Sequence, residues 1–275
     1  MTTTHTLLKG DCLQHMKSIA DKSVDLIIAD LPFGCLTGGG IATMSEEKRK
    51  EKYKGNTGTT INGCAWDIKI DLDAFWKEVR RIRKDEHTPT IHFCTTKYGF
   101  DLWESNKKEF RYDLVWDKGR GVSFLSANRM PMRSHEMIYV FSKAGANYNR
   151  VDISGNVTPR KATSVPHTSR TILASSGLRS QKENDGTKKC PLSVIQMNKL
   201  QNSSKLHPTE KPIELYKFLI ERYSKEGDTV LDPTFGSGNS GLACRELKRN
   251  YIGIEKNKDF FDKFNAKIHP INEIV

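Results

Sequence analysis

The sequence predicts an α/β protein built on a mostly parallel sheet with helices on both faces. Short apolar runs such as residues 24–29 alternate with stretches of helical apolar spacing such as residues 215–223, and this alternation favours parallel strands joined by helices. Two of the runs end in a carboxylate, at Asp30 and at Asp232, where an open α/β sheet binds its ligands. At 275 residues the chain is long enough for one large domain with a smaller inserted lobe.

The composition is that of a globular protein with a net charge of +11. This excess favours a polyanionic partner, and nucleic acid rather than a membrane because no basic amphipathic helix stands out. No apolar run approaches the roughly 20 residues that span a bilayer, and the first residues lack a signal-peptide pattern, so we expect a cytoplasmic protein. The six cysteines form no Cys-x-x-Cys pair, which predicts reduced thiols rather than disulfides or a metal site.

The first part of the chain predicts strands and helices in alternation. Strands are expected at residues 6–11, 24–30, 90–94, 111–116 and 136–141, and helices at 13–20, 71–82 and 97–108. Asp71 or Asp73 can cap the second helix, and a loop is expected around residues 119–121. Residues 35–65 hold too few apolar side chains to form core, which predicts a mobile loop, with plain disorder as the alternative.

The composition changes between residues 145 and 206. This segment is rich in Ser, Thr, Asn and Gly and carries ten basic residues against three acidic ones. It is therefore either a partly ordered linker or a lobe that binds an anionic surface. Regular structure resumes with a helix through residues 215–223, strands at 229–232 and 251–255, and helices at 239–247 and 259–267.

The glycine-rich turn after the strand at 229–232 has two interpretations. Gly236-x-Gly238-x-x-Gly241 matches the dinucleotide fingerprint, with Glu255 about 20 residues further on, which would indicate an NAD-dependent oxidoreductase. However, that fingerprint normally opens its domain, and Asp232 at the strand tip would repel a pyrophosphate. The same acid suits a cationic ligand such as S-adenosylmethionine, whose carboxylate the helix N-terminus favours and whose ribose Glu255 can bind.

Several motifs together resemble the β group of DNA amino-methyltransferases. Asp30-Leu31-Pro32-Phe33 is similar to the catalytic Asp-Pro-Pro-Tyr/Phe motif, with Leu31 in place of the usual proline, and Asp232-Pro-Thr-Phe-Gly-Ser-Gly238 is similar to the cofactor motif. His207-Pro-Thr-Glu-Lys-Pro212 resembles the segment that precedes the cofactor strand. Trp116-Asp117-Lys118 and His135-Glu136 resemble the middle motifs of the group.

This resemblance implies a fold and a division of the chain. The order of catalytic motif, basic segment and cofactor motif implies a Rossmann-like methyltransferase fold with a circularly permuted, mostly parallel, seven-stranded sheet. Residues 1–144 would form the catalytic half, with the loop 35–65 closing over the target. Residues 145–206 would form an inserted target-recognition segment, and residues 207–275 the cofactor-binding half.

The resemblance also implies site-specific methylation of double-stranded DNA with S-adenosylmethionine as cofactor. The target base would flip out of the duplex at a cost of a few kcal/mol and stack on Phe33. Asp30 and the carbonyl of Leu31 would accept hydrogen bonds from its amino group. An acid at the first motif position favours N6 of adenine over N4 of cytosine. Transfer would be direct, since the sequence has no Pro-Cys nucleophile motif.

Candidate site residues follow from the motifs, and no metal site is expected. The catalytic residues would be Asp30, Leu31, Pro32 and Phe33. The cofactor-binding residues would be Asp11, Asp30, His207, Thr209, Lys211, Asp232, Phe235, Gly236, Ser237, Gly238 and Glu255. The DNA-binding residues would be Arg150, Arg160, Lys161, Arg170, Arg179, Lys188 and Lys189, the arginines reading bases and most lysines contacting phosphates.

Simpler interpretations stay open at this point. Asp11 can be only a helix cap, His207 a turn residue and Glu255 a surface acid. N4-cytosine methylation, RNA methylation, oxidoreductase activity and an inactive DNA-binding protein are alternative functions. The resemblance leaves open a homodimer and a cognate restriction endonuclease as partners.

Overall fold

The computed structural model describes residues 3–33, 68–122, 124, 127–159, 161, 163–165, 179–181, 185–198 and 210–268. The predicted loop at residues 35–65 therefore lies outside the described residues, as do His207 and Thr209. The chain divides into two compact units. The first comprises Met1–Asn149 with Ser193–Val275, and the second comprises Arg150–Leu192.

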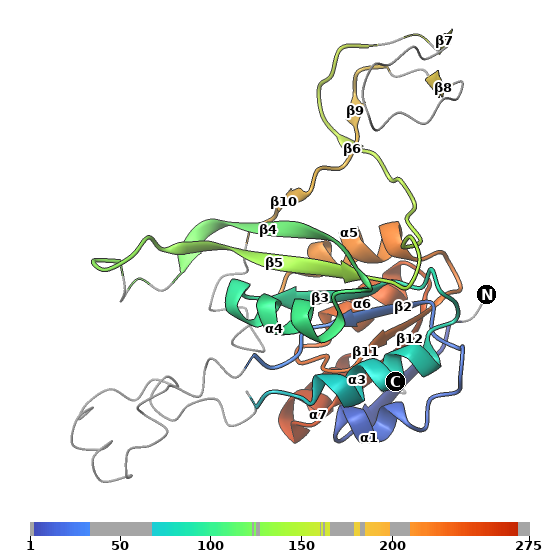
Figure 1. Cartoon of the computed structure of the whole chain (residues 1–275), viewed down its shortest axis with the longest axis vertical. Coiled ribbons are helices and arrows are strands. Elements are labelled where there is room, and N and C mark those ends of the chain that lie inside the picture. The colour runs from blue at the N-terminus through green and yellow to red at the C-terminus, as the bar shows by residue number, and fades with distance from the viewer. Residues whose placement is uncertain are drawn as a thin grey trace, which may run out of the picture. The chain divides into compact units, whose positions relative to one another are not determined.

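A single sheet of eight strands runs through the described part of the first unit (Figure 1). Its strands are β1 (His5–Lys9), β2 (Leu26–Ala29), β3 (Thr90–Cys94), β4 (Phe110–Val122), β5 (Arg133–Phe141), β10 (Val194–Gln196), β11 (Thr229–Asp232) and β12 (Asn250–Glu255). Their order is β1-β12-β11-β2-β3-β5-β4-β10, and only β5 runs antiparallel to its neighbours. The C-terminal strands β11 and β12 thus lie between β1 and β2. This order makes the two carboxylate-ending strands, β2 and β11, direct neighbours.

The sheet differs from the predicted one at its β4 edge. Strand β10, which the sequence does not predict, pairs in parallel with β4, and the Trp116 indole Nε1 donates to the carbonyl of Met197 at 2.8 Å. The loop predicted around residues 119–121 is wrong, because β4 continues to Val122, opposite Arg133 of β5. A register shift between Asp117 and Val122 absorbs the two glycines, and the β4–β5 ribbon extends well beyond the neighbouring strands (Figure 1).

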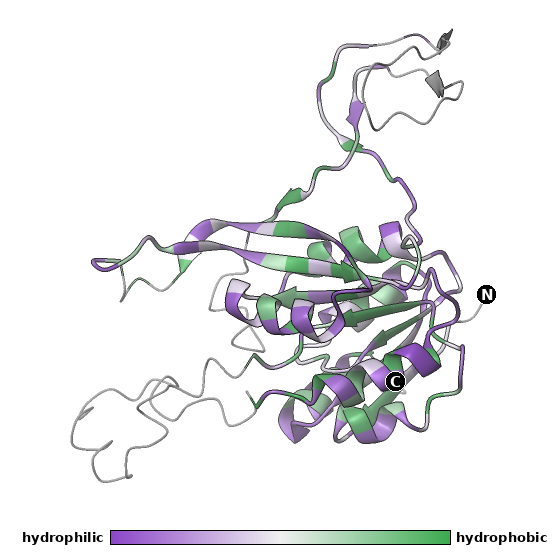
Figure 2. Ribbon diagram, in the orientation of Figure 1, coloured by the Kyte–Doolittle hydropathy of each residue, from purple (hydrophilic) through white to green (hydrophobic). Residues whose placement is uncertain are grey.

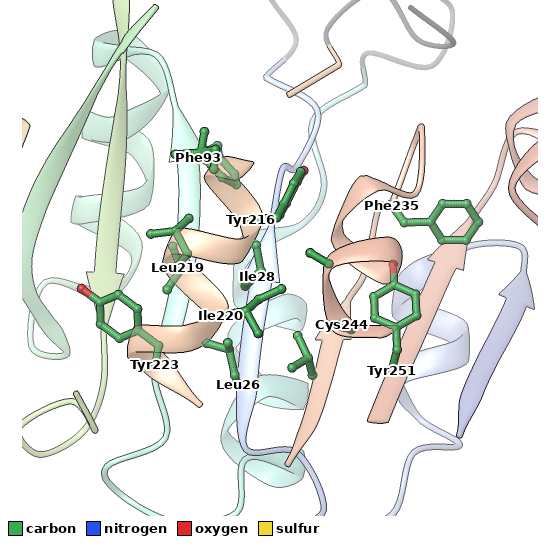
Figure 3. Packing of buried hydrophobic residues seen from close by; sticks show 14 of the residues in the cluster. Leu26, Ile28, Phe93, Tyr216, Leu219, Ile220, Tyr223, Phe235, Cys244 and Tyr251 are labelled. Atoms are coloured by element: carbon green, nitrogen blue, oxygen red, sulfur yellow. The ribbon is translucent and has the colours of Figure 1, made fainter. Parts of the chain in front are cut away.

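Helices cover both faces of the sheet. One face carries α1 (Cys12–Met16), α3 (Leu72–Ile82) and α4 (Thr96–Asn106), and the other carries α5 (Ile213–Tyr223), α6 (Asn239–Glu246) and α7 (Lys258–Ile268). Alternation along β2 explains the two cores, because Leu26 and Ile28 pack with α5 and α6 while Ile27 and Ala29 pack with α1 and α3 (Figure 3). Colouring by hydropathy shows the same arrangement, with apolar central strands and polar outer helix faces (Figure 2).

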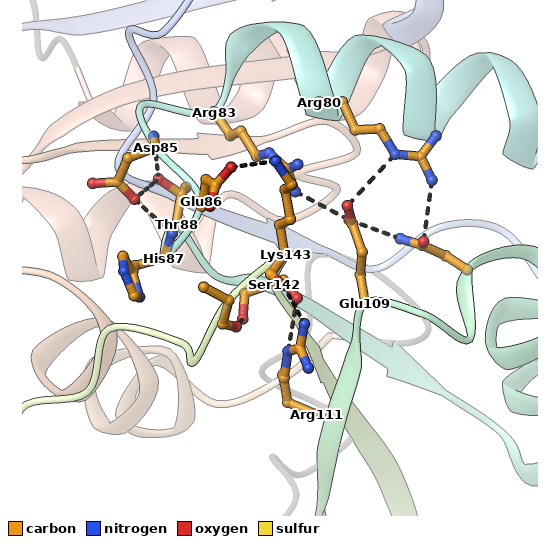
Figure 4. A network of polar contacts seen from close by, with 12 residues as sticks. Arg80, Arg83, Asp85, Glu86, His87, Thr88, Glu109, Arg111, Ser142 and Lys143 are labelled. Atoms are coloured by element: carbon orange, nitrogen blue, oxygen red, sulfur yellow. Dashed lines mark hydrogen bonds and ion pairs between the residues drawn. The ribbon is translucent and has the colours of Figure 1, made fainter.

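Arg80 and Arg83, at the end of α3, share the carboxylate of Glu109 (Figure 4). Arg83 donates to Glu109 at 3.0 Å, and Arg80 lies 3.7 Å from the same carboxylate and donates to Asn106 at 3.1 Å. Burial would raise the pKa of Glu109, but the hydrogen bond from Asn106 and the charge of Arg83 hold it below its usual value. These contacts therefore join the end of α3 to the connection between α4 and β4.

Among its described residues, the second unit contains two small antiparallel sheets. β6 (Ile153–Ser154) pairs with β9 (Lys188–Lys189), and β7 (Thr163–Val165) pairs with β8 (Arg179–Gln181). The sequence from Arg150 to Leu192 contains eight basic and three acidic residues. This small unit therefore carries a clear excess of positive charge.

The sequence also led to expectations about the cysteines, a metal site and a membrane-spanning segment. Cys12, Cys94, Cys190 and Cys244 are free thiols, and the first, second and fourth are buried. No three or more His, Cys, Asp or Glu side chains gather as a metal site in the described residues. No helix within the described ranges has the length and apolar character that crossing a membrane requires.

Candidate active site

A cavity of about 570 Å³ opens at the carboxyl ends of β1, β2, β11 and β12. Its volume lies within the range of small-molecule and cofactor sites. Ten of the predicted site residues line it: Asp11, Asp30, Leu31, Pro32, Phe33, Lys211, Phe235, Gly236, Ser237 and Glu255. The catalytic and cofactor motifs, two hundred residues apart in sequence, thus form one site because β2 and β11 are adjacent.

The segment that follows β2 forms one wall of the cavity. Leu31 is 1% exposed and anchors the corner in the core, while the backbone carbonyl of Asp30 accepts a hydrogen bond from Thr234 Oγ1 at 3.0 Å. The ring of Phe33 packs against Tyr98, with ring centroids 5.1 Å apart and planes inclined by 32°. The turn at residues 30–33, the catalytic corner, is therefore held by the burial of Leu31, the hydrogen bond from Thr234 and the packing of Phe33. These contacts act although Leu31 lacks the restricted φ of proline.

Asp30 is paired with a cation that comes from far along the chain. The Lys211 ammonium donates a hydrogen bond to Asp30 Oδ2 and lies 3.7 Å from Glu136 Oε2. Glu136 in turn pairs with Lys118, at 2.5 Å between Nζ and Oε1. Burial raises the pKa of Asp30 above its usual value, the charge of Lys211 acts against that rise, and Glu136 adds to it.

Asp232, at the end of β11, is buried and is not among the residues that line the cavity. Its Oδ2 accepts a hydrogen bond from Ser240 Oγ at 2.6 Å, and its Oδ1 accepts from the backbone N–H of Thr234 at 3.0 Å. Burial raises the pKa of this carboxyl to about 7, against the effect of both hydrogen bonds. Both carboxylate oxygens of Asp232 are thus hydrogen-bonded within the turn and α6.

The glycine turn brings backbone to the cavity wall. Gly236 has φ +54 and Gly238, which precedes α6, has φ +76, so both adopt a conformation that favours glycine. A Cβ at Gly238 would also lie 2.0 Å from the ring of Phe264. Gly236 lines the cavity, whereas Gly238 lies behind it and packs the turn onto α7.

Two acids face the part of the cavity furthest from the β5 side. Glu255 accepts hydrogen bonds from the N–H groups of Gly236 at 2.9 Å and Asn257 at 2.7 Å, and burial raises its pKa despite them. Each of its oxygens can still accept a second hydrogen bond. Asp11 caps α1 through Leu13 N at 3.0 Å, so it is a helix cap and a cavity residue at once.

Several cavity residues were missed by the sequence analysis. Lys256 and Asn257 follow Glu255 directly, so their position at the end of β12 could have indicated them. Phe260 and Tyr216 come from the first turns of α7 and α5, and Ile70 precedes α3. These three reach the cavity through helix placement, for which the sequence carries no local signal.

The cavity fits S-adenosylmethionine by the chemistry of its lining. Carboxylates at Asp11 and Glu255 can accept from ribose hydroxyls, the glycine turn exposes backbone, and the Phe235 ring offers an apolar surface. Asp30 is the acid on the opposite side, next to Phe33. The arrangement can therefore hold a nucleoside at one side and present a carboxylate at the other.

The predicted DNA-binding residues belong to the second unit or lie outside the described residues. Arg150 forms an ion pair with Asp152 at 2.5 Å, and Lys161 is exposed. Lys188 and Lys189 form β9, and the backbone of Arg179 begins β8. Arg160 and Arg170 are not among the described residues.

Comparison with known proteins gives a consistent family. The sequence model of the N6/N4 DNA methylase family matches residues 24–266. The Type II methyltransferase M.HinfI of Haemophilus influenzae is 27% identical over 97% of this chain and 69% of its own length. The Type II methyltransferase M2.MboI of Moraxella bovis is 26% identical over 98% of this chain and 89% of its own length.

Solved structures show the same fold. PvuII DNA methyltransferase, described as cytosine-N4-specific, superposes with a TM-score of 0.63 at 16% identity, covering 100% of this chain and 89% of that one. The M1.HpyAVI complex with S-adenosylmethionine gives a TM-score of 0.57 at 18% identity, covering 96% and 100%. TTHA0409 of Thermus thermophilus, also complexed with S-adenosylmethionine, gives 0.53 at 17% identity, covering 97% of both chains. The mostly parallel Rossmann-like fold expected from the sequence is thereby confirmed.

Proposed function

We propose that this protein methylates N6 of adenine at specific sites in double-stranded DNA. The premise is that the chain belongs to the N6/N4 family of DNA methylases and takes S-adenosylmethionine as its cofactor. The observation that carries the proposal is Asp30, a carboxylate that ends β2, lines the cavity and has a lysine partner. The family match supports methylation of an exocyclic amine in DNA. The acid at the first motif position is the reason for choosing adenine.

The chemistry asks the site to make an aromatic amine nucleophilic. The lone pair of the N6 amino group is delocalised into the ring, so acceptors must draw its hydrogens out of the ring plane. Asp30 supplies a side-chain acceptor and the carbonyl of Leu31 supplies the second. S-adenosylmethionine supplies, when bound, a methyl group with electrophilic character. The nitrogen loses one proton after transfer, and the Asp30 carboxylate is the acceptor beside it.

A flipped base needs an apolar partner outside the duplex. Phe33 is half-buried, its ring packs against Tyr98, and the residue lines the cavity. Stacking of one base on an aromatic side chain is worth about 1–3 kcal/mol, comparable to the cost of flipping. Phe33 is therefore the proposed stacking platform, and Pro32 fixes the turn that presents it.

The cofactor is proposed to bind along the ends of β11, β12 and β1. Glu255 and Asp11 would accept from the ribose and adenine, and Phe235, Gly236 and Ser237 would form the wall beside them. Asp232 and Gly238 would support that wall from behind. His207 and Thr209 keep their proposed place near the methionine end, on the strength of the motif resemblance alone.

DNA recognition is proposed for the basic segment at residues 145–206. Lys188 and Lys189 form β9 of the β6–β9 sheet, and the segment's excess of positive charge attracts a polyanion. The flanking parts, residues 1–144 and 207–275, would be the catalytic and cofactor halves. A cytoplasmic location, a homodimer and a cognate restriction endonuclease are compatible with the Type II relatives and are part of the proposal.

The test is the identity of the methylated base. Duplex DNA of mixed sequence is incubated with the protein and S-adenosylmethionine carrying a labelled methyl group, digested to nucleosides and analysed by mass spectrometry. We expect label in N6-methyl-2′-deoxyadenosine, with none when the same preparation receives RNA. Label only in N4-methyl-2′-deoxycytidine would replace adenine by cytosine, and label only in RNA would exclude DNA as substrate. An absence of label with every nucleic acid would contradict the proposed activity.

A further inference from the structure

Four charged side chains of alternating sign form a chain that ends at the catalytic corner. They come from four elements: Asp30 follows β2, Lys211 precedes α5, Glu136 lies in β5 and Lys118 lies in β4. Lys211 Nζ bonds Asp30 Oδ2 and lies 3.7 Å from Glu136 Oε2, and Lys118 Nζ lies 2.5 Å from Glu136 Oε1. This ion-pair network has no net charge, because two lysines alternate with two acids.

Both lysines of this ion-pair network are almost fully buried, although Lys211 contributes to the cavity lining, and the two acids are more exposed. The side chains of Lys211 and Lys118 are each 3% exposed, compared with 22% for Asp30 and 18% for Glu136. A buried ammonium is costly unless it is paired, and an apolar residue could fill the same space without that cost. The Lys211 ammonium also lies 4.6 Å from the ring centroid of Phe93. A lysine buried at this place therefore indicates a role for its charge.

We propose that Lys211, steadied by Glu136 and Lys118, is the positioning residue for Asp30: it holds Oδ2 and keeps the carboxylate ionised, so that Oδ1 accepts the hydrogen bond of the target's amino group. This inference rests on the proposed function, since it assigns a role in that same transfer. It also gives Lys211 a role besides the expected cofactor contact, because the ammonium contacts Asp30 and lies 3.7 Å from Glu136.

The surroundings of Asp30 make such a cation necessary. The titratable groups that act on it from the neighbouring elements are Lys211, Lys118, Glu136, Asp232, Cys94 and Tyr216. Only the two lysines in this set favour the ionised carboxylate, and Lys211 is the one in contact. Burial already raises the pKa of Asp30, so without Lys211 it would rise further and the acid would be protonated. A protonated carboxyl would be a poorer acceptor for the amino group.

The pH profile of kcat separates this role from a structural one. An opposite charge in contact shifts a carboxyl pKa by about 1–3 units, so Lys211→Met should move the acidic limb up by about one pH unit or more. Glu136→Gln removes a negative neighbour, keeps the shape, and should move the limb down. Lys211→Arg keeps the charge and should restore the wild-type limb even if the rate is lower.

A matched control exists on α5. Lys217 pairs with Glu214 at 3.2 Å and with Glu246, and does not line the cavity. Lys217→Met therefore loses two ion pairs and should leave the pH profile in place. S-adenosylmethionine affinity is measured for each variant by calorimetry, to detect a direct cofactor contact of Lys211.

The outcomes distinguish this inference from the proposed function. Opposite shifts for Lys211→Met and Glu136→Gln support the positioning role. Equal loss of rate at every pH, or a weakened cofactor affinity with an unmoved limb, would overturn it while methylation by the wild-type protein stands. If Lys211→Met does not fold, the shift in Glu136→Gln decides alone, and an unmoved limb there would contradict the inference. A wild-type protein without methyl transfer would remove the proposed function itself.

Discussion

Two strand ends in this protein look alike in sequence and differ in chemistry. Asp30 and Asp232 each end a buried strand, each is followed within three residues by a proline and a phenylalanine, and the two strands are hydrogen-bonded neighbours. Yet Asp30 lines the cavity and pairs with Lys211, whereas Asp232 turns inward to Ser240 and the backbone of Thr234. One acid is placed for a ligand and the other holds a turn.

The partner of each acid determines which role it takes. Asp232 is bonded locally, by residues two and eight positions further along, so its turn and α6 form one compact unit. Asp30 is bonded by a lysine 181 residues away, which only the completed fold can deliver. Hydrogen bonds from nearby residues satisfy both oxygens of Asp232 behind the cavity wall. Asp30 lines the open cavity, and the charge of a lysine distant in sequence balances its negative charge.

Asp30→Ala should have the largest effect of any change at these two corners. The substitution removes the acceptor for the amino group, and loss of one such electrostatic group costs about 10²–10³ in kcat. Asp30 does not contact the Glu255 side of the cavity, so S-adenosylmethionine should still bind within a few-fold of wild type. The measurement is single-turnover methylation of duplex DNA alongside a calorimetric titration of the cofactor. Transfer at nearly the wild-type rate would show that the other corner, or neither, carries the chemistry.

Much of this site could be predicted from local sequence. The strand ends, the glycine turn and the Asp71 cap of α3 all depend on neighbours within a few residues, and the structure places them as expected. The inward orientation of Asp232 could not be predicted, because it depends on where Ser240 lies once α6 has packed. The pairing of Asp30 with Lys211 could not be predicted either, because sequence pattern carries no distance between residues 181 positions apart.

The same limit explains the errors at the edge of the sheet. The glycines near residue 120 are typical of a loop, and their placement in β4 depends on pairing with β5 across a register shift. Strand β10 has only three residues, too few for a recognisable alternation, and forms because the β4 edge offers it partners. Tertiary context decides both elements.

Asp232→Asn should have a small effect on transfer and a clear effect on the pH dependence of stability. An amide has the size of the carboxylate and can still accept a hydrogen bond from Ser240. We therefore expect kcat within about threefold of the wild-type value, a smaller change than the loss of a typical hydrogen bond would cause. The pKa of Asp232 is raised to about 7 from an ordinary value of 3.8, so its favourable contribution is complete below about pH 4 and is lost as pH rises through 7. The variant should lack that loss.

Urea denaturation of wild type and Asp232→Asn between pH 5 and 8 tests this prediction. The difference in unfolding free energy should grow in favour of the variant by up to about 1.4 kcal/mol per pH unit, and level off above pH 7. A flat difference for Asp232→Asn would mean that this acid is ionised in the fold throughout the range.

His92→Phe should have the smallest effect on activity and completes the comparison with a group that has no polar partner at all. His92 lies in β3 beside β2, fully buried between Phe75, Trp76 and Phe141, and neither ring nitrogen has a hydrogen-bond partner among the described residues. Burial lowers its pKa to about 3. The folded protein therefore holds it neutral, and stability falls as pH drops below about 6.5, where the unfolded chain binds the proton.

A phenylalanine fills this aromatic cage without an unpaired polar group. We expect unfolding free energy at pH 7 to rise by about 1 kcal/mol, since a buried unsatisfied group costs about 1–3 kcal/mol, and methylation to be unchanged. Below pH 6.5 the gain should widen by up to about 1.4 kcal/mol per pH unit, which is the opposite pH direction to Asp232→Asn. Denaturation of both variants over one pH series measures the two slopes together. If the stability gains of the two variants changed with pH in the same direction, burial would not lower the pKa of His92 and raise that of Asp232 as stated.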